Sequence, residues 1–183
     1  MELIKEIKQS KILRNVFIAL MGTVLLAISS KIKIPFYPVP MTMQTLVVMF
    51  LGITLGWKLG VSIVVLYLFE GIIGLPVFSG SPEKGVGMVY FTGPTMGYLI
   101  GFLFTVYFVG SFNFSKNLLV RLSQLIFSVS FIYIFGILWL GALIGWEKPL
   151  FQLGIQPFLL AELFKILIVL ISLPKLKKFN QYL

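Results

Sequence analysis

Long apolar runs alternate along the chain with connections that are polar or rich in Gly and Pro. A helix that crosses the hydrocarbon core of a bilayer needs about 20 mostly apolar residues. Runs of this kind predict six membrane-spanning helices near residues 16–28, 42–55, 59–73, 94–112, 119–140 and 156–173. The first run lacks a small-residue cleavage site, so we interpret it as an uncleaved helix and not as a signal peptide. We therefore predict an all-α integral membrane protein, with one domain over residues 1–183.

The charges predict how these spans are oriented. Only 11% of the residues are charged and 58% are hydrophobic, which excludes a soluble globular domain. Because short cytoplasmic loops of membrane proteins collect Lys and Arg, the net charge of +9 indicates topology and not nucleic-acid binding. A cytoplasmic amino terminus places ten cations inside, namely Lys5, Lys8, Lys11, Arg14, Lys58, Lys116, Arg121, Lys175, Lys177 and Lys178, and four outside, namely Lys31, Lys33, Lys84 and Lys148. We expect a multi-pass protein of the cell membrane with both termini in the cytoplasm.

Two of the predicted outer connections, after the first and third spans, differ from the short inner ones. Residues 31–40 read KIKIPFYPVP, and residues 75–93 read LPVFSGSPEKGVGMVYFTG. The second is longer than a simple connection requires. Long loops rich in Gly and Pro are often lids or binding loops. The other interpretation is a mobile connection that contacts no ligand.

Three ionisable residues fall within the predicted spans: Glu70, Glu162 and Lys165. A charge at the centre of a membrane helix costs about 2.5 to 3.5 kcal/mol on insertion scales, so such residues usually face a cavity or a partner. Glu162 and Lys165 are three residues apart and share one helix face. They could contact one ligand or form a structural ion pair. Glu70 lies closer to the interface, which favours a structural role.

Small residues recur at intervals of four and predict smooth helix faces that allow close packing in lipid. The sets are Gly52 and Gly56, then Gly93, Gly97 and Gly101, and finally Ala19, Thr23 and Ala27. Packing within the chain is the simpler interpretation of the glycine sets. For the alanine and threonine stripe, docking on another membrane subunit is an equal alternative.

Missing residue types exclude several functions. The sequence has no Cys, His or Asp, which leaves little for hydrolytic or metal chemistry, so we expect no enzyme and no cofactor. It also lacks the G-x-x-x-x-G-K-[ST] loop that binds ATP phosphates. A transporter of this kind must take its energy from another subunit or from an ion gradient.

Four segments, VPMTMQTLVV, GIIGLPVFSG, FTGPTMGYLIGF and PFLLAELFK, resemble the signature segments of the BioY family and occur in the same order. That family comprises the biotin-specific substrate-binding subunits, or S components, of energy-coupling-factor transporters. The resemblance implies a six-helix membrane protein that captures biotin, as transported ligand and not as cofactor, near its outer face. It also implies partners: a transmembrane coupling subunit and two ATPase subunits.

The resemblance also suggests site residues. Glu162 and Lys165 match the family's polar anchors for biotin, although the family typically has Asp at the first position. The candidate substrate-binding residues are Glu162, Lys165, Ser79, Gly80, Tyr98, Phe78 and Gln44. The stripe of Ala19, Thr23 and Ala27 resembles the family's alanine-rich docking motif, with Thr23 in place of an alanine.

The chemistry of biotin suggests a role for each anchor. Lys165 would suit the carboxylate and Glu162 the two N–H groups of the ureido ring. In the reversed interpretation, the acid only holds the lysine in position. A different function remains open, in which a self-sufficient secondary transporter uses Glu70 or Glu162 as a proton carrier.

Overall fold

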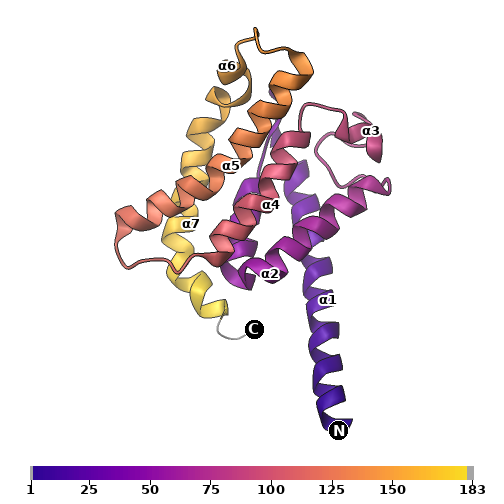
Figure 1. Ribbon diagram of the computed structural model, residues 1–183, viewed down its shortest axis with the longest axis vertical. Helices are drawn as coiled ribbons and strands as arrows, with labels where there is room; N and C mark the ends of the chain where they lie inside the picture. Colours follow the sequence, from indigo (N-terminus) through magenta and orange to yellow (C-terminus); the bar gives the residue numbers. More distant parts are fainter. Residues whose placement is uncertain (1, 181–183) are drawn as a thin grey trace.

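The computed structural model describes residues 2–180, and the side chains of residues 11–176. Its elements, in chain order, are α1 (Glu2–Lys31), β1 (Lys33–Ile34), β2 (Met41–Thr42), α2 (Gln44–Ile72), α3 (Met88–Phe91), α4 (Met96–Ser111), α5 (Leu118–Ile144), α6 (Leu150–Gly154), the 3-10 turn η1 (Gln156–Phe158) and α7 (Leu159–Asn180) (Figure 1). The two short strands pair antiparallel as a hairpin. The side chains of Lys5, Lys8, Lys177 and Lys178, counted above as inner cations, lie outside the described residues.

The predicted spans correspond to long apolar helices, as expected for an integral membrane protein. Within the described residues, four helices are long and apolar enough to cross a bilayer: Lys11–Lys31, Gln44–Ile72, Leu118–Ile144 and Leu150–Leu176. Helix α4 is a shorter apolar helix.

The expected second and third spans are two helices that meet at a kink and together carry the label α2. Gly56 interrupts the helical geometry between them, with φ 74° and ψ 170°. A left-handed φ of this kind favours glycine, because a Cβ would crowd the backbone there. The short link predicted over residues 56–58 therefore coincides with the kink at Gly56 that separates the two helices.

Close approach of backbones holds the centre of the bundle together. Helix α4 packs between α2 and α5. A Cβ on Gly97 would meet the Phe135 carbonyl oxygen of α5, and one on Gly101 would meet the backbone of Ile132. These two glycines thus serve internal packing, the simpler interpretation of their spacing.

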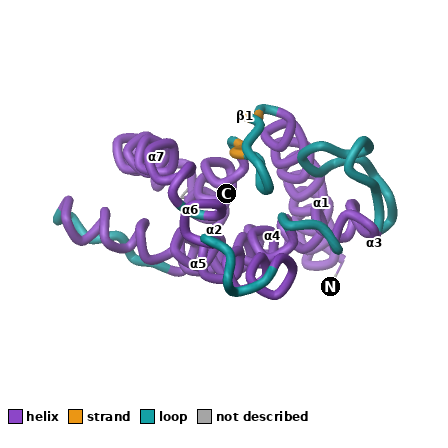
Figure 2. Tube along the Cα trace, turned by 90° about the horizontal axis from the view of Figure 1, so that it is seen from above, coloured by secondary structure: helices purple, strands orange, loops and turns teal. Residues whose placement is uncertain are grey.

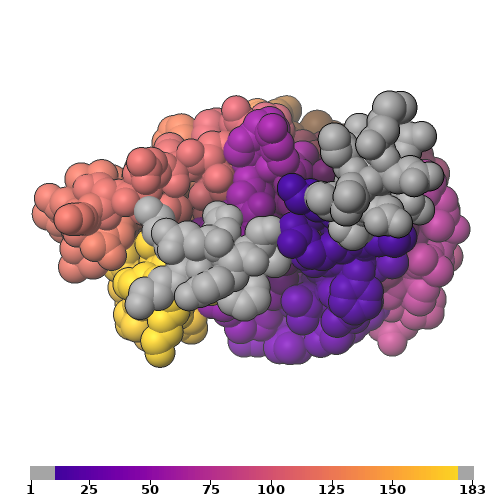
Figure 3. Space-filling view, turned by 90° about the horizontal axis from the view of Figure 1, so that it is seen from below, coloured from indigo at the N-terminus to yellow at the C-terminus, as the bar shows by residue number. Residues whose placement is uncertain are grey.

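The connections gather at the two ends of the molecule. The β1–β2 hairpin, the α2–α3 loop and the α5–α6 connection lie at the upper end in Figure 1, and the start of α1 and the end of α7 lie at the lower end. Seen from above and from below, the first turns of α5 form one edge, and α1 lies on the other side of the molecule, next to the α2–α3 region (Figures 2 and 3). Helix α7 packs mainly on α2. This arrangement brings loops and helices together around a cavity.

Candidate functional site

A cavity of about 530 Å³, its open mouth included, lies where the β1–β2 hairpin and the α2–α3 loop meet the helices. Its apolar wall includes Val39, Tyr98, Leu99, Phe102, Ile132 and Phe158. Its polar groups include Thr42, Gln44, Thr45, Ser79, Tyr133, Glu162 and Lys165. Small-molecule sites usually combine apolar walls with a few polar groups in this way.

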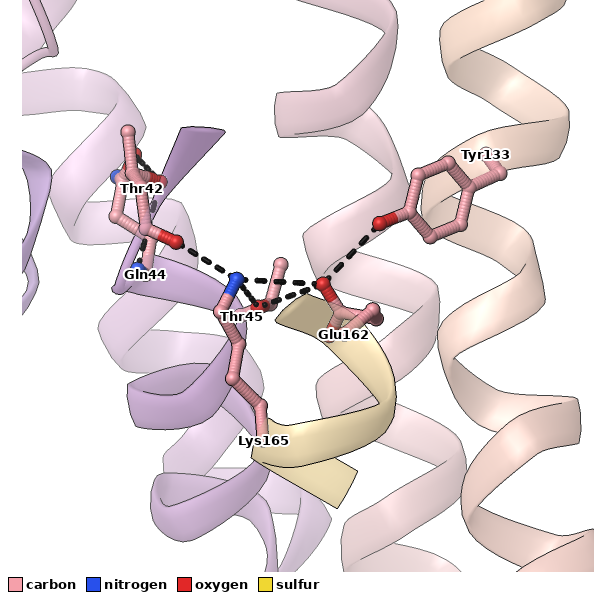
Figure 4. A network of polar contacts seen from close by, with 6 residues as sticks. All are labelled: Thr42, Gln44, Thr45, Tyr133, Glu162 and Lys165. Atoms are coloured by element: carbon pink, nitrogen blue, oxygen red, sulfur yellow. Dashed lines mark hydrogen bonds and ion pairs between the residues drawn. The ribbon is translucent and has the colours of Figure 1, made fainter. Parts of the chain in front are cut away.

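Lys165 of α7 is buried, with 5% of its surface exposed, and its ammonium contacts three acceptors. Nζ donates to the Thr42 carbonyl oxygen at 2.8 Å and to Thr45 Oγ1 at 2.9 Å. It also pairs with Glu162 Oε2 at 3.3 Å (Figure 4). Because an ammonium has three N–H donors, these three contacts use all of them.

The two carboxylate oxygens of Glu162 differ sharply in their surroundings. Oε2 accepts hydrogen bonds from Thr45 Oγ1 and from the Tyr133 hydroxyl, each at 3.1 Å, as well as the Lys165 contact. Oε1 is buried and has no hydrogen-bond partner among the described residues. An unpartnered buried oxygen is unusual, because desolvating a polar atom without a new bond is unfavourable. Among the described residues, Oε1 is thus an acceptor that no donor uses.

Helices α5 and α7 also border a second, apolar groove, which shares Tyr133 and Glu162 with the cavity. The other residues of this groove are mostly aliphatic. The Tyr133–Glu162 hydrogen bond therefore lies at the boundary between the polar cavity and an apolar, lipid-like environment. The three donors on Oε2 offset the cost of burying the charge there.

Ser79 is the second cavity residue with an unpartnered polar atom. Its side chain is buried, and Oγ has no hydrogen-bond partner within the described part of the chain. The backbone next to it is fixed, because the Tyr90 hydroxyl donates to the Ser79 carbonyl oxygen at 2.7 Å. Burial raises the pKa of Tyr90 above its ordinary value, so this hydroxyl remains a donor at neutral pH.

Two predicted site residues lie in the same loop but do not line the cavity. The ring of Phe78 stacks on Tyr90 at 4.7 Å between centroids and meets Tyr67 edge to face at 5.2 Å. Phe78 therefore packs on the side of the loop that faces away from the cavity and helps to hold the loop in place. Gly80 has φ +80° and forms the turn. The sequence placed both residues in the correct segment but could not show which way each one faces.

Gln44 and Tyr98 do line the cavity, and each already has a polar partner. Gln44 Nε2 donates to the Tyr67 hydroxyl at 2.8 Å. The Tyr98 hydroxyl donates to the Gly154 carbonyl oxygen at 2.9 Å. Tyr98 thus lines the cavity, while its hydroxyl is occupied by the hydrogen bond to Gly154.

The predicted docking stripe is buried at its centre and partly exposed on either side of it. Thr23 is 2% exposed and donates to the Leu20 carbonyl oxygen at 2.9 Å. Ala19 and Ala27 contact the hydrophobic core and are only partly buried. Thr23 therefore contributes to packing within the chain, and docking of the stripe on another subunit stays a prediction. Glu70 is not among the residues that line the cavity.

Sequence reasoning missed Thr45 and Tyr133, which complete the surroundings of Glu162. Thr45 follows Gln44 in a segment that was already singled out, so its position gave a usable signal. Tyr133 is one aromatic residue among many on an apolar helix. Only the packing of α5 beside α7 reveals its role.

Comparison with known proteins shows the family to which the chain belongs. The model of the BioY family matches residues 4–182. Biotin transporter BioY of Thermotoga maritima is 31% identical over 157 residues, which cover 85% of this chain and 91% of that protein. Biotin transporter BioY2 of Lactococcus lactis is 31% identical over 155 residues, covering 82% and 83%.

A solved structure has the same fold. It is the crystal structure of the S-component for biotin from an ECF-type ABC transporter, with a TM-score of 0.75 and 28% sequence identity. The match covers 92% of this chain and 93% of that one. These relatives are transporters by name and not enzymes. With its long apolar helices and a family match over nearly its whole length, the chain is a multi-pass membrane protein that belongs to the BioY family.

Proposed function

We propose that this chain is the biotin-binding S component of an energy-coupling-factor transporter. The observation that carries the proposal is the asymmetry of Glu162, whose Oε2 has three donors while the buried Oε1 has none. Biotin presents two N–H groups and a carbonyl oxygen on its ureido ring, next to an apolar bicycle. An unpartnered carboxylate oxygen within an apolar cavity suits such a ring.

The roles of the polar residues follow from which of their hydrogen-bond donors and acceptors still lack a partner among the described residues. Glu162 Oε1 accepts a ureido N–H, and Ser79 Oγ, which is also unpartnered, bonds the same ring. Lys165 has its three donors on Thr42, Thr45 and Glu162, so it fixes the acid instead of binding the valerate carboxylate. This assignment keeps Glu162 as the ureido contact and replaces the carboxylate role first expected for Lys165.

We further propose six spans in one domain over residues 1–183, counting the two arms of α2 on either side of Gly56 separately. Both termini then lie in the cytoplasm, and the β1–β2 hairpin and the α2–α3 loop lie outside. Their position at the end opposite the termini supports this topology (Figure 1). The bias of Lys and Arg toward the inner side supports it as well.

Import would then require the transmembrane coupling subunit and two ATPase subunits, because the sequence holds no ATP-binding loop of its own. The stripe of Ala19, Thr23 and Ala27 would contact the coupling subunit, and the partial exposure of Ala19 and Ala27 supports this assignment. Biotin uptake by vesicles that contain all partners should require ATP. Uptake that persists without the ATPases and stops when the proton gradient is dissipated would instead indicate a secondary transporter.

A binding titration tests the proposed ligand. The detergent-purified protein should bind biotin and not riboflavin, a vitamin of different shape and polarity. Lys165→Ala should weaken binding at least tenfold, because Glu162 then keeps a buried charge without its counter-ion. Lys148→Ala, on the exposed α5–α6 connection, is the matched control and should bind as the wild type does. Absence of biotin binding to the wild type would refute the proposal.

A further inference from the structure

The backbone of the α2–α3 loop is held by side chains from three different helices. The Val77 carbonyl oxygen accepts from Ser30 Oγ at 2.7 Å and from the Tyr67 hydroxyl at 3.0 Å. The Ser79 carbonyl oxygen accepts from Tyr90, as described above. Helices α1, α2 and α3 thus each donate to the segment that carries Ser79.

Lys31, the last residue of α1, makes the most extensive of these contacts. Its ammonium donates to the carbonyl oxygens of Phe78 and Ser81, each at 2.9 Å, and to Ser81 Oγ at 3.4 Å. Three acceptors again match the three donors of an ammonium. Hydrogen bonds from a charged donor are stronger than neutral ones. One side chain therefore connects the end of α1 to two peptide groups of the loop.

The two carbonyl groups held by Lys31 flank Ser79 along the chain. Ser79 is the loop residue that lines the cavity, and its buried Oγ has no partner among the residues with described side chains. We infer that Lys31 is a positioning residue: from the end of α1 it clamps residues 78–81 so that the Ser79 hydroxyl stays at the cavity wall. Lys31 itself is not among the residues that line the cavity.

Further contacts make this clamp part of a rigid support. Ser30, which is fully buried, bonds its hydroxyl to the Ala27 carbonyl oxygen as well as to Val77. Ser81 Oγ donates to the Phe78 carbonyl oxygen at 2.7 Å. The loop therefore follows the position of the α1 terminus. Without the ammonium, two loop carbonyls lose a charged donor while the remaining bonds stay intact.

Because the clamp acts on the loop that covers the ligand, its loss should show mainly in the rate of ligand release. With the full chain in lipid nanodiscs, the dissociation rate of biotin is measured for the wild type, Lys31→Met and Lys31→Arg. Lys31→Met should accelerate release about tenfold, which corresponds to about 1.4 kcal/mol. Lys31→Arg keeps a charged donor and should stay within about threefold of the wild type.

A second readout follows the loop itself and needs no ligand. Backbone amides in the loop bond loop carbonyls, as in Ser81 N to Phe78 O at 3.2 Å and Lys84 N to Gly80 O at 2.8 Å. In Lys31→Met, hydrogen exchange of peptides over residues 77–87 should be about tenfold faster, since the opening of this local unit costs less. Lys33→Met removes a neighbouring exposed cation and is the matched control, which should change neither readout.

The ligand assay rests on the proposed function, whereas the exchange assay does not. A wild-type protein that fails to bind biotin would refute the proposed ligand, and the exchange comparison would still decide the role of Lys31. Unchanged release and unchanged exchange in Lys31→Met would overturn the inference. The same acceleration in Lys33→Met would also overturn it, because the effect would then come from the loss of any positive charge in this region and not from the contacts of Lys31.

Discussion

Replacing Glu162 by Gln preserves the shape of the side chain and exchanges one oxygen for an amide nitrogen. Thr45 and Tyr133 donate to Oε2 at 3.1 Å, and Lys165 donates at 3.3 Å. Because all three neighbours are donors, the amide oxygen of Gln should occupy the place of Oε2. The NH₂ group then takes the place of Oε1, so the unpartnered acceptor becomes a donor.

The expected loss follows from this inversion. A hydrogen bond to a charged group contributes about 1.5 to 3 kcal/mol, and a buried donor left without an acceptor costs about 1 to 3 kcal/mol. In Glu162→Gln, the ureido N–H of biotin would meet the amide N–H of the glutamine. The hydrogen bond to the carboxylate is then lost, and a buried donor is left without an acceptor. We therefore expect the biotin affinity of Glu162→Gln to fall by at least about 2.8 kcal/mol, which is a hundredfold.

Isothermal titration of the purified protein measures this change. Glu147→Gln makes the same chemical change at an exposed position on the α5–α6 connection and should bind as the wild type does. Glu162→Gln also leaves Lys165 buried without a counter-ion, so its thermal stability should decrease. The double variant Glu162→Gln/Lys165→Met removes that unpaired charge. It should recover much of the stability without recovering biotin binding.

The result that would refute this reasoning is specific. If Glu162→Gln is folded and binds biotin within about threefold of the wild type, Oε1 does not receive a charge-assisted bond from the ligand. If the double variant regains full affinity together with its stability, the loss in the single variant came from misfolding.

Three further substitutions test neighbouring parts of the site. Tyr133→Phe removes one donor from Glu162 Oε2, so biotin affinity should fall about tenfold in the same titration, and an unchanged affinity would contradict the role of Tyr133. Ser79→Ala should weaken biotin binding about tenfold and leave the melting temperature unchanged, because its Oγ has no partner among the described residues. A fall in melting temperature would instead indicate a structural hydroxyl. Gly71→Ala would place a Cβ within the Phe78 ring, so we expect about 1 to 3 kcal/mol of destabilisation in thermal unfolding. If Gly71→Ala were as stable as the wild type, the loop that carries Phe78 would have to move without cost to accommodate the new methyl group.

The sequence predicted the features of the fold that depend on local composition. Apolar runs are continuous and long, so they locate the helices of a membrane protein well. The link expected over residues 56–58 coincides with the kink at Gly56, where a positive φ changes the direction of the chain between two helices. Polar residues within spans are rare and costly, and this cost was sufficient to locate Glu162 and Lys165.

Features that depend on how helices pack were harder to predict. The spacing of Ala19, Thr23 and Ala27 indicates a smooth face but not how much of it the same chain covers, and here only Thr23 is buried. Tyr133 lies on α5, far from Glu162 in the sequence, and no local pattern distinguishes it from the other aromatic residues of that helix. Phe78 is adjacent to Ser79, yet the two side chains differ in direction, which only the folded loop determines.

The same limitation applies to the roles of the charged pair. A lysine beside a glutamate on one helix face allows either residue to contact the ligand. The contacts of Lys165 with Thr42 and Thr45 use its remaining donors, and both partners come from the region between β2 and α2. Contacts of the ion pair with Thr42 and Thr45 thus join α7 to the start of α2, and among the described residues one oxygen of the acid has no partner.

An experimental structure with biotin bound tests the central claim most directly, through the distance between the ligand's ureido nitrogen and Glu162 Oε1. The account predicts a hydrogen bond of about 2.7 to 3.2 Å, with Lys165 still on Thr42, Thr45 and Glu162. A ligand whose ureido ring lies away from Glu162, or whose carboxylate has displaced the contacts of Lys165, would contradict it.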